Sequence, residues 1–306
     1  MYLSGLKSIT KMGFAITGAS GWLGRATIAT LLESGINPLD IKCFSTERKI
    51  ICVENIEFQS HPLCELRISE DIDTLVHLAF LTRDKVDASN LMRYSTINRE
   101  ITSFACDFII KKKPRSFISI SSGAIYDAPA FTCLADSFNL NPYGYLKIEE
   151  EKRLEQACVE SNANLVINRL WGLSGQDIQN AQPYALAEFI HKAKMNDVIE
   201  IKSRNKVWRR YVDARELMAL CLEVANRGDT AIFNSGGPLV EIGELAELVV
   251  KYLSSSSKIT RDASDVSDNP NTYYPKDQSY EELLMKYLKK SPLPLKYQIL
   301  NTSSTL

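Results

Sequence analysis

Short apolar runs alternate with longer amphipathic stretches through the first half of the chain. The runs predict buried strands at 14–16, 41–44, 50–58, 74–79, 116–120 and 165–167. The stretches between them predict helices, one of which ends in a lysine cluster just before Pro114. Near-continuous apolar strands separated by helices indicate a parallel sheet that is covered on both faces. Because crossovers between parallel strands are right-handed, the pattern predicts an α/β, doubly wound domain.

The pattern changes after Gly172, where the segments become mixed and polar. Helices are predicted at 183–194, 215–226 and 242–254, and the stretch 254–271, rich in Ser, Asp and Asn, is predicted to be a loop. We therefore expect a first domain over 12–172, to which segments of about 205–235 return. A smaller C-terminal lobe is expected over 173–291, followed by a tail, 292–306, that has few packing signals.

The chain carries 36 Lys and Arg against 37 Asp and Glu, so its formal net charge is −1. This balance leaves no positive footprint for nucleic acid or an anionic membrane, and neither partner is expected. Seven cysteines without a C-x-x-C pair are typical of reduced thiols in a cytosolic protein. Three histidines, none spaced to share a metal, predict no metal site. No apolar run approaches the ~20 residues that span a bilayer, which favours a cytoplasmic protein.

The segment 17–24, TGASGWLG, lies between the first predicted strand and the first predicted helix. Gly18 would allow a tight turn, Gly21 would let a diphosphate approach the backbone, and Gly24 would let the helix pack on the strand. The N–H groups at the start of the helix would then face the diphosphate. An ordinary glycine-rich turn is the alternative. The segment predicts a dinucleotide cofactor held by Gly18, Ser20, Gly21, Trp22, Leu23 and Gly24.

Tyr143 and Lys147 are four residues apart, so they share one face of a predicted helix. An ammonium beside a phenol stabilises the phenolate, and we expect Lys147 to lower the pKa of Tyr143. Ser122 follows the strand 116–120 at the carboxyl edge of the sheet, where ligands of such sheets bind. A hydroxyl there can hydrogen-bond a substrate oxygen as that oxygen gains or loses charge.

Five further segments follow one another along the chain. They are 73–79 (DTLVHLA), 121–126 (SSGAIY), 141–147 (NPYGYLK), 209–213 (RRYVD) and 233–237 (FNSGG). Together with the glycine loop, these segments resemble the extended short-chain dehydrogenase/reductase family, in its NAD-dependent epimerase/dehydratase group that acts on nucleotide sugars. The resemblance covers roughly 12–250 and implies a Rossmann-like sheet with a smaller substrate-binding lobe.

The resemblance also implies roles for individual residues. Tyr143 would give or take the proton at the reacting carbinol, and Lys147 would hold the nicotinamide ribose. Ser122 would supply the catalytic hydroxyl that contacts the substrate. Arg209 and Arg210 would bind the diphosphate of a nucleotide sugar.

Three residues near the fourth predicted strand complete this set. Leu78 and Ala79, at its end, would contact the cofactor. Asn98 falls on the following helix, where the family often has an Asn. An exposed helix position is the alternative for Asn98.

The end of the second predicted strand indicates which nicotinamide cofactor is used. Enzymes that use NAD usually carry an acidic residue there, whereas this chain carries Ser45 and Arg48. A hydroxyl and a guanidinium suit a ribose 2′-phosphate, and Arg25 would assist them. NADP(H) is therefore favoured, while Glu47 keeps NAD(H) open.

The residues after Ser122 restrict the reaction. Dehydratases of the family place an Asp-Glu pair there, and GDP-fucose synthases place a Cys at the second position. This chain carries Gly123 and Ala124, so neither activity is expected. Ketone reduction and C4 epimerisation remain. Because reduction needs a cofactor that exchanges, the NADP(H) prediction favours reduction of a 4-keto-6-deoxy nucleotide sugar.

Two alternatives to the reductase stay open. One is a nucleotide-sugar C4 epimerase that retains NAD. The other is a non-catalytic, cofactor-sensing protein, although such proteins usually lose the Tyr or Lys that this chain keeps. Gly172 replaces an Asn that commonly touches the sugar or the diphosphate in the family, which leaves the sugar open. The expected partner is a nucleotide-diphosphate sugar, and a homodimer through the helices after the fourth and fifth strands is also compatible with the sequence.

Overall fold

The computed structural model describes residues 13–68, 72–87, 89–126, 137–179, 184–261 and 270–306. These residues form two compact units. The first unit comprises the described residues up to Leu170 together with Met218–Phe233, and the second comprises Trp171–Leu217 and Asn234–Leu306. Positions 12 and 183, where a domain and a helix were predicted to begin, lie outside the described residues.

An eight-stranded sheet forms the centre of the first unit, in the order β12-β7-β6-β5-β1-β2-β4-β3. The strands are β1 (Phe14–Thr17), β2 (Ile41–Ser45), β3 (Lys49–Val53), β4 (Ile56–Pro62), β5 (Thr74–His77), β6 (Ser116–Ser122), β7 (Asn164–Leu170) and β12 (Ala231–Asn234). From β7 to β4 all neighbours run parallel. β1, β5 and β6 are buried along their whole length, as strands covered on both faces must be. The predicted doubly wound α/β fold is confirmed.

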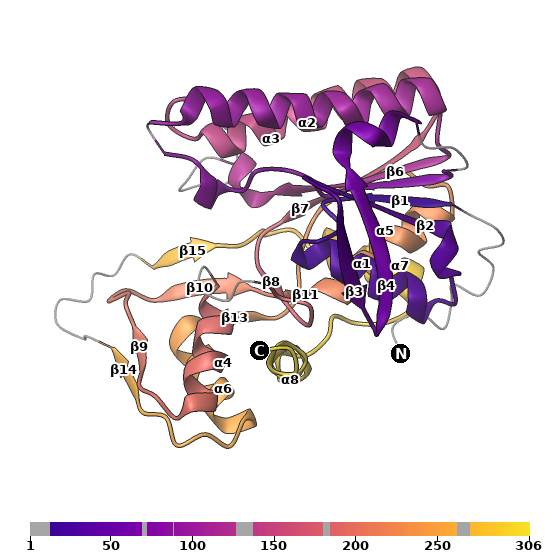
Figure 1. Cartoon of the computed structure of the whole chain (residues 1–306). Coiled ribbons are helices and arrows are strands. Elements are labelled where there is room, and N and C mark those ends of the chain that lie inside the picture. Colours follow the sequence, from indigo (N-terminus) through magenta and orange to yellow (C-terminus); the bar gives the residue numbers. More distant parts are fainter. Residues whose placement is uncertain (1–12, 69–71, 88, 127–136, 180–183, 262–269) are drawn as a thin grey trace. The chain divides into compact units, whose positions relative to one another are not determined.

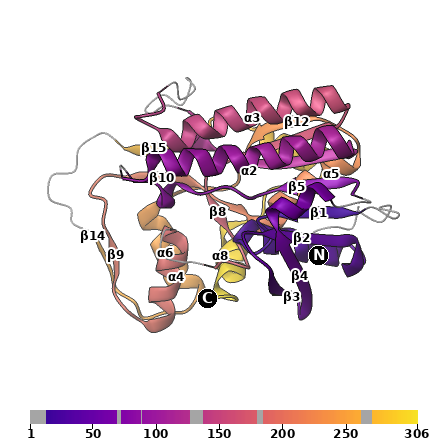
Figure 2. The same ribbon diagram turned by 45° about the horizontal axis from the view of Figure 1, so that its top comes forward.

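Helices cover this sheet on two sides. They are α1 (Trp22–Glu33), α2 (Leu91–Lys112), α3 (Pro142–Ser161) and α5 (Ala214–Asn226). Figure 1 and Figure 2 both show α2 and α3 lying side by side along one face, while α1 and α5 lie on the other face in Figure 1. Phe108 of α2 and Leu154 of α3 pack with Phe117 and Ile167 of the sheet in one buried cluster.

The run 50–58, predicted as a single third strand, is a hairpin of two strands. β3 and β4 pair antiparallel, with Val53 opposite Ile56. The two residues between them, Glu54 and Asn55, both have positive φ, at 49° and 62°. A two-residue turn of this kind matches the right-handed twist of the paired strands. The imperfect alternation of the run therefore reflects a turn inside it.

The second unit is built from short strands and helices. Its strands are β8 (Leu173–Ser174), β9 (Ile199–Ile201), β10 (Val207–Arg210), β11 (Val212–Asp213), β13 (Leu239–Glu241), β14 (Ile259–Arg261) and β15 (Asn271–Tyr273). Its further helices are α4 (Ala185–Met195), α6 (Ile242–Tyr252), α7 (Ser279–Leu288) and α8 (Leu295–Ser303). Side chains of α4, α6 and α8 share one buried apolar cluster with β9 and β10.

Two predictions for the second unit need correction. Part of the predicted loop 254–271 is strand β14, which pairs parallel with β9, and 262–269 lie outside the described residues. The predicted tail 292–306 contains helix α8, on which Gln298, Ile299 and Thr302 are buried.

Polar contacts explain why an apolar pattern did not reveal α8. The Gln298 Nε2 donates to the carbonyl oxygens of Tyr211, at 3.1 Å, and Leu293, at 2.7 Å. The backbone N–H of Gly175 donates to Thr302 Oγ1 at 2.8 Å. The buried face of α8 is thus held by hydrogen bonds as well as by Ile299. Within the described ranges, no helix has the length and apolarity needed to cross a bilayer.

Candidate active site

The glycine loop packs directly against the end of β5. Gly18 has φ +68°, and a Cβ there would lie 2.8 Å from the carbonyl carbon of Leu78 and 2.9 Å from the N of Ala79. A Cβ on Gly24 would lie 2.6 Å from Ala19 Cα. All of these neighbours are backbone atoms, which cannot move aside as a side chain can. The loop therefore needs glycine at both positions to bring β1, β5 and α1 together.

The start of α1 is suited to an anion. Its N-cap is Gly21, which is exposed, has no side-chain cap, and is followed by no acidic residue in the first turn. Ser20 and Leu23 are partly exposed beside it, whereas Trp22 and Gly24 are buried. The uncapped N–H groups and the positive end of the helix dipole are the features that bind phosphate in other proteins. The cradle fits the diphosphate of a dinucleotide.

Leu78 and Ala79 lie beside this loop through Thr17. Both backbone N–H groups donate to Thr17 Oγ1, at 3.1 and 3.2 Å. Thr17 is the last residue of β1, immediately before Gly18. The predicted cofactor residues of the loop and those that follow β5 thus lie together at one edge of the sheet.

Tyr143 lies in the first turn of α3, which Asn141 ties to the end of β6. Asn141 Oδ1 accepts from the N–H of Gly144 at 2.9 Å, and Asn141 Nδ2 donates to the carbonyl oxygen of Ala124 at 2.7 Å. A Cβ on Gly144 would lie 2.9 Å from the carbonyl carbon of Ala124. The close approach brings Tyr143 to Ser122, the last residue of β6.

Burial raises the pKa of Tyr143 to about 12, while its hydrogen bond with Ser122 acts in the opposite direction. The sequence predicted a pKa lowered by Lys147. In the structure burial of the phenol is the largest influence on this pKa, and the Lys147 ammonium is engaged elsewhere. Its Nζ donates to Glu150 Oε2 at 2.7 Å and to the carbonyl oxygen of Ile120 at 3.0 Å.

Phe80 stands between the ends of β5 and α3. Lys147 Nζ lies 3.7 Å from the centroid of the Phe80 ring, and the ring of Tyr143 meets it edge-on at 5.9 Å. An ammonium over an aromatic face is attracted to it electrostatically. Sequence reasoning did not single out Phe80, since an aromatic residue after a strand carries no signal of its own.

Asn98 holds the segment that carries Phe80. It is 1% exposed, so the exposed alternative for this residue is wrong. Its Oδ1 accepts from the N–H of Leu81 at 2.7 Å, and Tyr94 Oη donates to the carbonyl oxygen of Leu81 at 2.7 Å. Both contacts fix the backbone next to Phe80.

The residues predicted to bind a 2′-phosphate already have partners. Arg48 donates to both carboxylate oxygens of Glu65, at 2.7 and 2.9 Å, and its hydrogen bond holds the pKa of Glu65 below the usual value. Ser45 is buried and bonds the carbonyl oxygen of Glu47 at 2.8 Å and Ser60 Oγ at 2.7 Å. Arg25, the predicted assistant, donates to the carbonyl oxygen of Cys52 at 2.8 Å.

The two predicted diphosphate-binding arginines, both on β10 of the second unit, differ in their partners. Arg210 forms an ion pair with Glu281 at 2.7 Å. Arg209 donates to the carbonyl oxygens of Trp208 and Asn271 and lies over the ring of Tyr273, 5.5 Å from its centroid. Among the described residues no carboxylate pairs with Arg209, and burial lowers the pKa of its guanidinium.

The order of these features along the chain matches a known family. Residues 14–236 match the model of the NAD dependent epimerase/dehydratase family, well over half of the chain. The chain belongs to this family. The resemblance predicted from the sequence motifs is thereby confirmed, and with it an enzyme family of the short-chain dehydrogenase/reductase type.

Relatives within this family are distant. The chain is 24% identical to a UDP-glucose 4-epimerase of Dictyostelium discoideum over 208 residues, which cover 58% of this chain and 60% of that protein. A UDP-glucose 4-epimerase of Caenorhabditis elegans is 22% identical over 212 residues, 56% of this chain and 61% of that protein. The matched region thus spans about three fifths of these curated relatives.

Solved structures show the same fold over nearly the whole chain. A UDP-N-acetylglucosamine 4-epimerase from Methanobrevibacter ruminantium M1, in complex with UDP-N-acetylmuramic acid, has a TM-score of 0.76 at 17% identity and covers 97% of this chain and 98% of its own. The protein MoeE5, in complex with UDP-glucose and NAD, has a TM-score of 0.74 at 16% identity, with 95% and 97% covered.

Proposed function

We propose that this member of the NAD dependent epimerase/dehydratase family is a nucleotide-sugar 4-epimerase that retains its nicotinamide cofactor. The observation that carries the proposal is the convergence of Ser122, Tyr143 and Lys147 at the ends of β6 and α3, on a domain whose glycine loop offers an uncapped helix start. The UDP-sugar 4-epimerases among the relatives support the same reaction.

The cofactor that best suits the end of β2 is NAD(H). The sequence favoured NADP(H) because of Ser45 and Arg48, and that preference was the argument for a reductase. Here the Glu65 carboxylate already neutralises Arg48, and a 2′-phosphate would bring a second anion against it. The Ser45 hydroxyl is likewise committed to Glu47 and Ser60. With the NADP(H) argument removed, retained NAD and epimerisation take precedence over ketone reduction.

In the proposed reaction Tyr143 transfers the proton and Ser122 hydrogen-bonds the reacting oxygen. A bound nicotinamide supplies a hydride acceptor and donor. Tyr143 takes the hydroxyl proton of the C4 carbinol as the hydride leaves C4, which gives a 4-ketone. Tyr143 returns the proton when the hydride comes back to the opposite face of that ketone. Ser122 holds the reacting oxygen throughout. No proton or hydride is gained or lost over the whole cycle.

The substrate's diphosphate is assigned to Arg209. The guanidinium of Arg209 is half-buried and has no carboxylate partner among the described residues, so its charge is available to bind an external anion. Arg210 is less suited, because Glu281 already neutralises it at 2.7 Å. A nucleotide-diphosphate sugar is therefore the proposed substrate class, with UDP-sugars tried first.

The test begins with the cofactor. Freshly purified protein is denatured, and the released nucleotide is identified by chromatography. We expect NAD in near-stoichiometric amount, and we expect UDP-glucose or UDP-N-acetylglucosamine to give its C4 epimer without added NADPH. Net oxidation of NADPH by a 4-keto-6-deoxy sugar nucleotide, with an empty site on purification, would instead establish the reductase.

Replacing Glu65 with Gln should raise the affinity for NADPH relative to NADH by roughly fivefold, because it releases the exposed Arg48 from its ion pair. Fluorescence titration of both cofactors measures the ratio. Glu57→Gln removes the same charge from an exposed position of β4 and should leave the ratio unchanged. The gain should vanish when Arg48→Gln is added. An unchanged ratio in Glu65→Gln would mean that Arg48 does not face the ribose.

A further inference from the structure

Lys147, the residue expected to hold the nicotinamide ribose, is covered by the protein itself and is only 4% exposed. Its Nζ has three neighbours: Glu150 Oε2 at 2.7 Å, the carbonyl oxygen of Ile120 at 3.0 Å, and the ring of Phe80, whose centroid lies 3.7 Å away. A lysine ammonium has three protons, so each of them already faces a partner within the protein. An external hydroxyl can bind Lys147 only if one of these neighbours moves aside.

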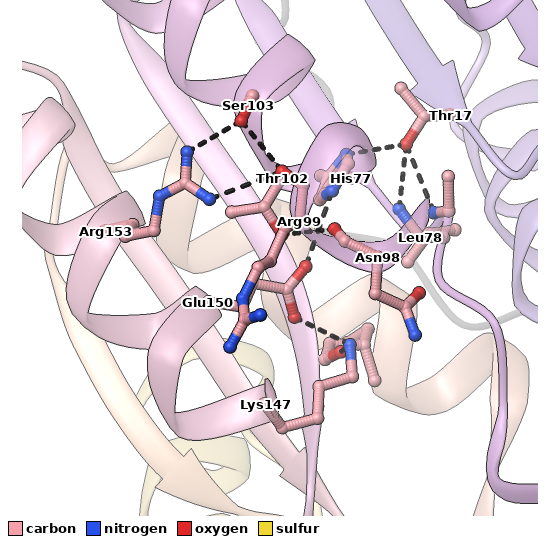
Figure 3. Close-up of polar contacts among 12 residues, drawn as sticks. Thr17, His77, Leu78, Asn98, Arg99, Thr102, Ser103, Lys147, Glu150 and Arg153 are labelled. Carbon is pink, nitrogen blue, oxygen red and sulfur yellow. Dashed lines mark hydrogen bonds and ion pairs between the residues drawn. The ribbon is translucent and has the colours of Figure 1, made fainter. Parts of the chain in front are cut away.

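Glu150 is fixed in the interior by further polar contacts. Figure 3 shows Lys147 and Glu150 at one end of a row of side chains that continues to His77 and Thr17. His77 Nε2 lies 3.5 Å from Glu150 Oε1, and His77 Nδ1 lies 2.8 Å from Thr17 Oγ1. Moving Lys147 away from Glu150 would leave a buried carboxylate without its cation, which is strongly destabilising. The ion pair is therefore expected to stay intact when a ligand binds.

The carbonyl group of Ile120 is fixed by the sheet. Ile120 lies in β6, which is hydrogen-bonded between β5 and β7 in the central sheet. Its register partner on β7 is Asn168, and every residue of β6 is buried. Because the backbone of a paired strand sets the direction of each carbonyl, this acceptor cannot turn away from Lys147 unless the sheet is distorted. The second neighbour of Lys147 is thus as firmly held as the first.

The Phe80 ring is the neighbour that can move. Phe80 lies beyond the end of β5 and is only partly buried. Its ring is attracted to the Lys147 ammonium and meets the Tyr143 ring edge-on at 5.9 Å, and such contacts are weak beside a buried ion pair. The backbone next to it is held at Leu81 by the two hydrogen bonds described above. The ring can therefore leave Lys147 by rotation of its own side chain, while the segment stays in place.

The ring also lies close to the residues that would hold the rest of the cofactor. Phe80 directly follows Ala79, whose N would lie 2.9 Å from a Cβ on Gly18 of the glycine loop. On its other side the ring contacts Lys147 and Tyr143. Phe80 thus lies between the loop suited to a diphosphate and the pair assigned to the nicotinamide end of the cofactor.

We propose that Phe80 is a positioning residue for Lys147 that competes with the nicotinamide ribose. Its ring covers the ammonium in the cofactor-free protein and rotates away when the ribose hydroxyls bind there. The proposal rests on the proposed NAD-retaining function, in which Lys147 binds this ribose, and names a side chain that sets the affinity for the cofactor. When a site is open in only a fraction of the molecules, the apparent affinity of its ligand falls by that fraction. Removing the ring should therefore strengthen the binding of ligands that carry this ribose, and of no others.

The test compares two nucleotides that share adenosine diphosphate and differ in the second ribose. ADP lacks this ribose, and ADP-ribose carries it. Calorimetric titration of the cofactor-free, full-length protein measures the dissociation constant of each. Phe80→Ala should bind ADP-ribose about three- to tenfold more tightly than the parent does, while its affinity for ADP should stay the same. NADH, followed by its fluorescence, should show the same gain as ADP-ribose.

Phe138→Ala is the matched control. Phe138 also has a cation near its ring, Arg99 at 5.9 Å from the centroid, and it meets Tyr145 of α3 edge-on at 5.7 Å. Its loss should leave both affinities unchanged. A second variant, Phe80→Leu, keeps apolar bulk at the site and serves if Phe80→Ala does not fold. Leucine has no aromatic face to attract the ammonium, so Phe80→Leu should also bind ADP-ribose more tightly, by about twofold or more.

Equal affinities of the parent and Phe80→Ala for ADP-ribose, including no binding by either, would overturn the proposal. Weaker binding by the variant would also overturn it, because the ring would then pack against the bound ribose. So would an equal gain for ADP, which would mean that the ring acts on the adenosine diphosphate half. Failure of the proposed function is distinguishable, since these titrations need no turnover. A protein with the ribose-specific gain that epimerises no sugar nucleotide would refute the proposed reaction and leave the role of Phe80 standing.

Discussion

Replacing Tyr143 with Phe should reduce kcat by about 10²- to 10⁴-fold, the range that a single acid–base group supplies. The substitution removes one hydroxyl and keeps the ring. The edge-on contact with Phe80 at 5.9 Å is therefore retained, and so is the packing of α3 on β6. Cofactor content and thermal unfolding should stay close to those of the parent. Steady-state kinetics on the sugar nucleotide found active, together with released NAD, measure both sides of this prediction.

Tyr145→Phe is the matched control for this substitution. Tyr145 lies on the same helix, two residues on, and packs edge-on with Phe138 at 5.7 Å. Its variant should keep full activity. If Tyr143→Phe turned over substrate at more than one tenth of the parent rate, another group would have to move the proton. If neither the parent protein nor Tyr143→Phe turned over any sugar nucleotide while both bound NAD, the result would support the cofactor-sensing alternative.

The sequence predicted those parts of the site whose chemistry depends on spacing along the chain. Gly18, Gly21 and Gly24 are spaced as a strand–turn–helix crossing requires, and the structure has the turn between β1 and α1. Tyr143 and Lys147 share one face of α3 because they are four residues apart. Such relations are local, so they can be read without knowing which strands are neighbours.

The electrostatic partners of these residues could not be predicted in the same way. Glu65 is 17 residues from Arg48, and Glu150 is 73 residues from His77, so their contacts depend on how the elements pack. The spacing of Glu150 from Lys147 was readable, but three glutamates follow one another at 149–151 and nothing local distinguishes them. Their partners differ: Glu150 is 2% exposed and pairs with Lys147, Glu149 pairs with Arg99 on the surface, and Glu151 pairs with Arg169. Burial of the Tyr143 phenol, which raises its pKa, depends on the same packing and could not be read from spacing.

Replacing Gly24 with Ala should lower the free energy of unfolding by about 3 kcal/mol, at the upper end of what an overpacked methyl group causes. Helix propensity alone predicts the opposite, because Ala in place of Gly inside a helix stabilises it by about 1 kcal/mol. The steric effect is expected to win, since the new Cβ would lie 2.6 Å from Ala19 Cα, within the backbone of the loop itself. Chemical denaturation of the cofactor-free protein measures the change.

Substitutions at different loop glycines should affect stability and cofactor binding differently. A Cβ on Gly21 would meet only the carbonyl oxygen of Gly18, at 3.3 Å, so Gly21→Ala should unfold near the parent midpoint yet bind NAD more weakly at the helix start. Gly35 has φ +82° and nothing within 4 Å of its would-be Cβ, and Asn tolerates that backbone region. Gly35→Asn should therefore cost less than about 1 kcal/mol of stability and leave NAD binding unchanged. If Gly24→Ala were as stable as Gly35→Asn, the loop would have room to shift away from α1. The glycine would then be needed for the approach of the diphosphate rather than for packing.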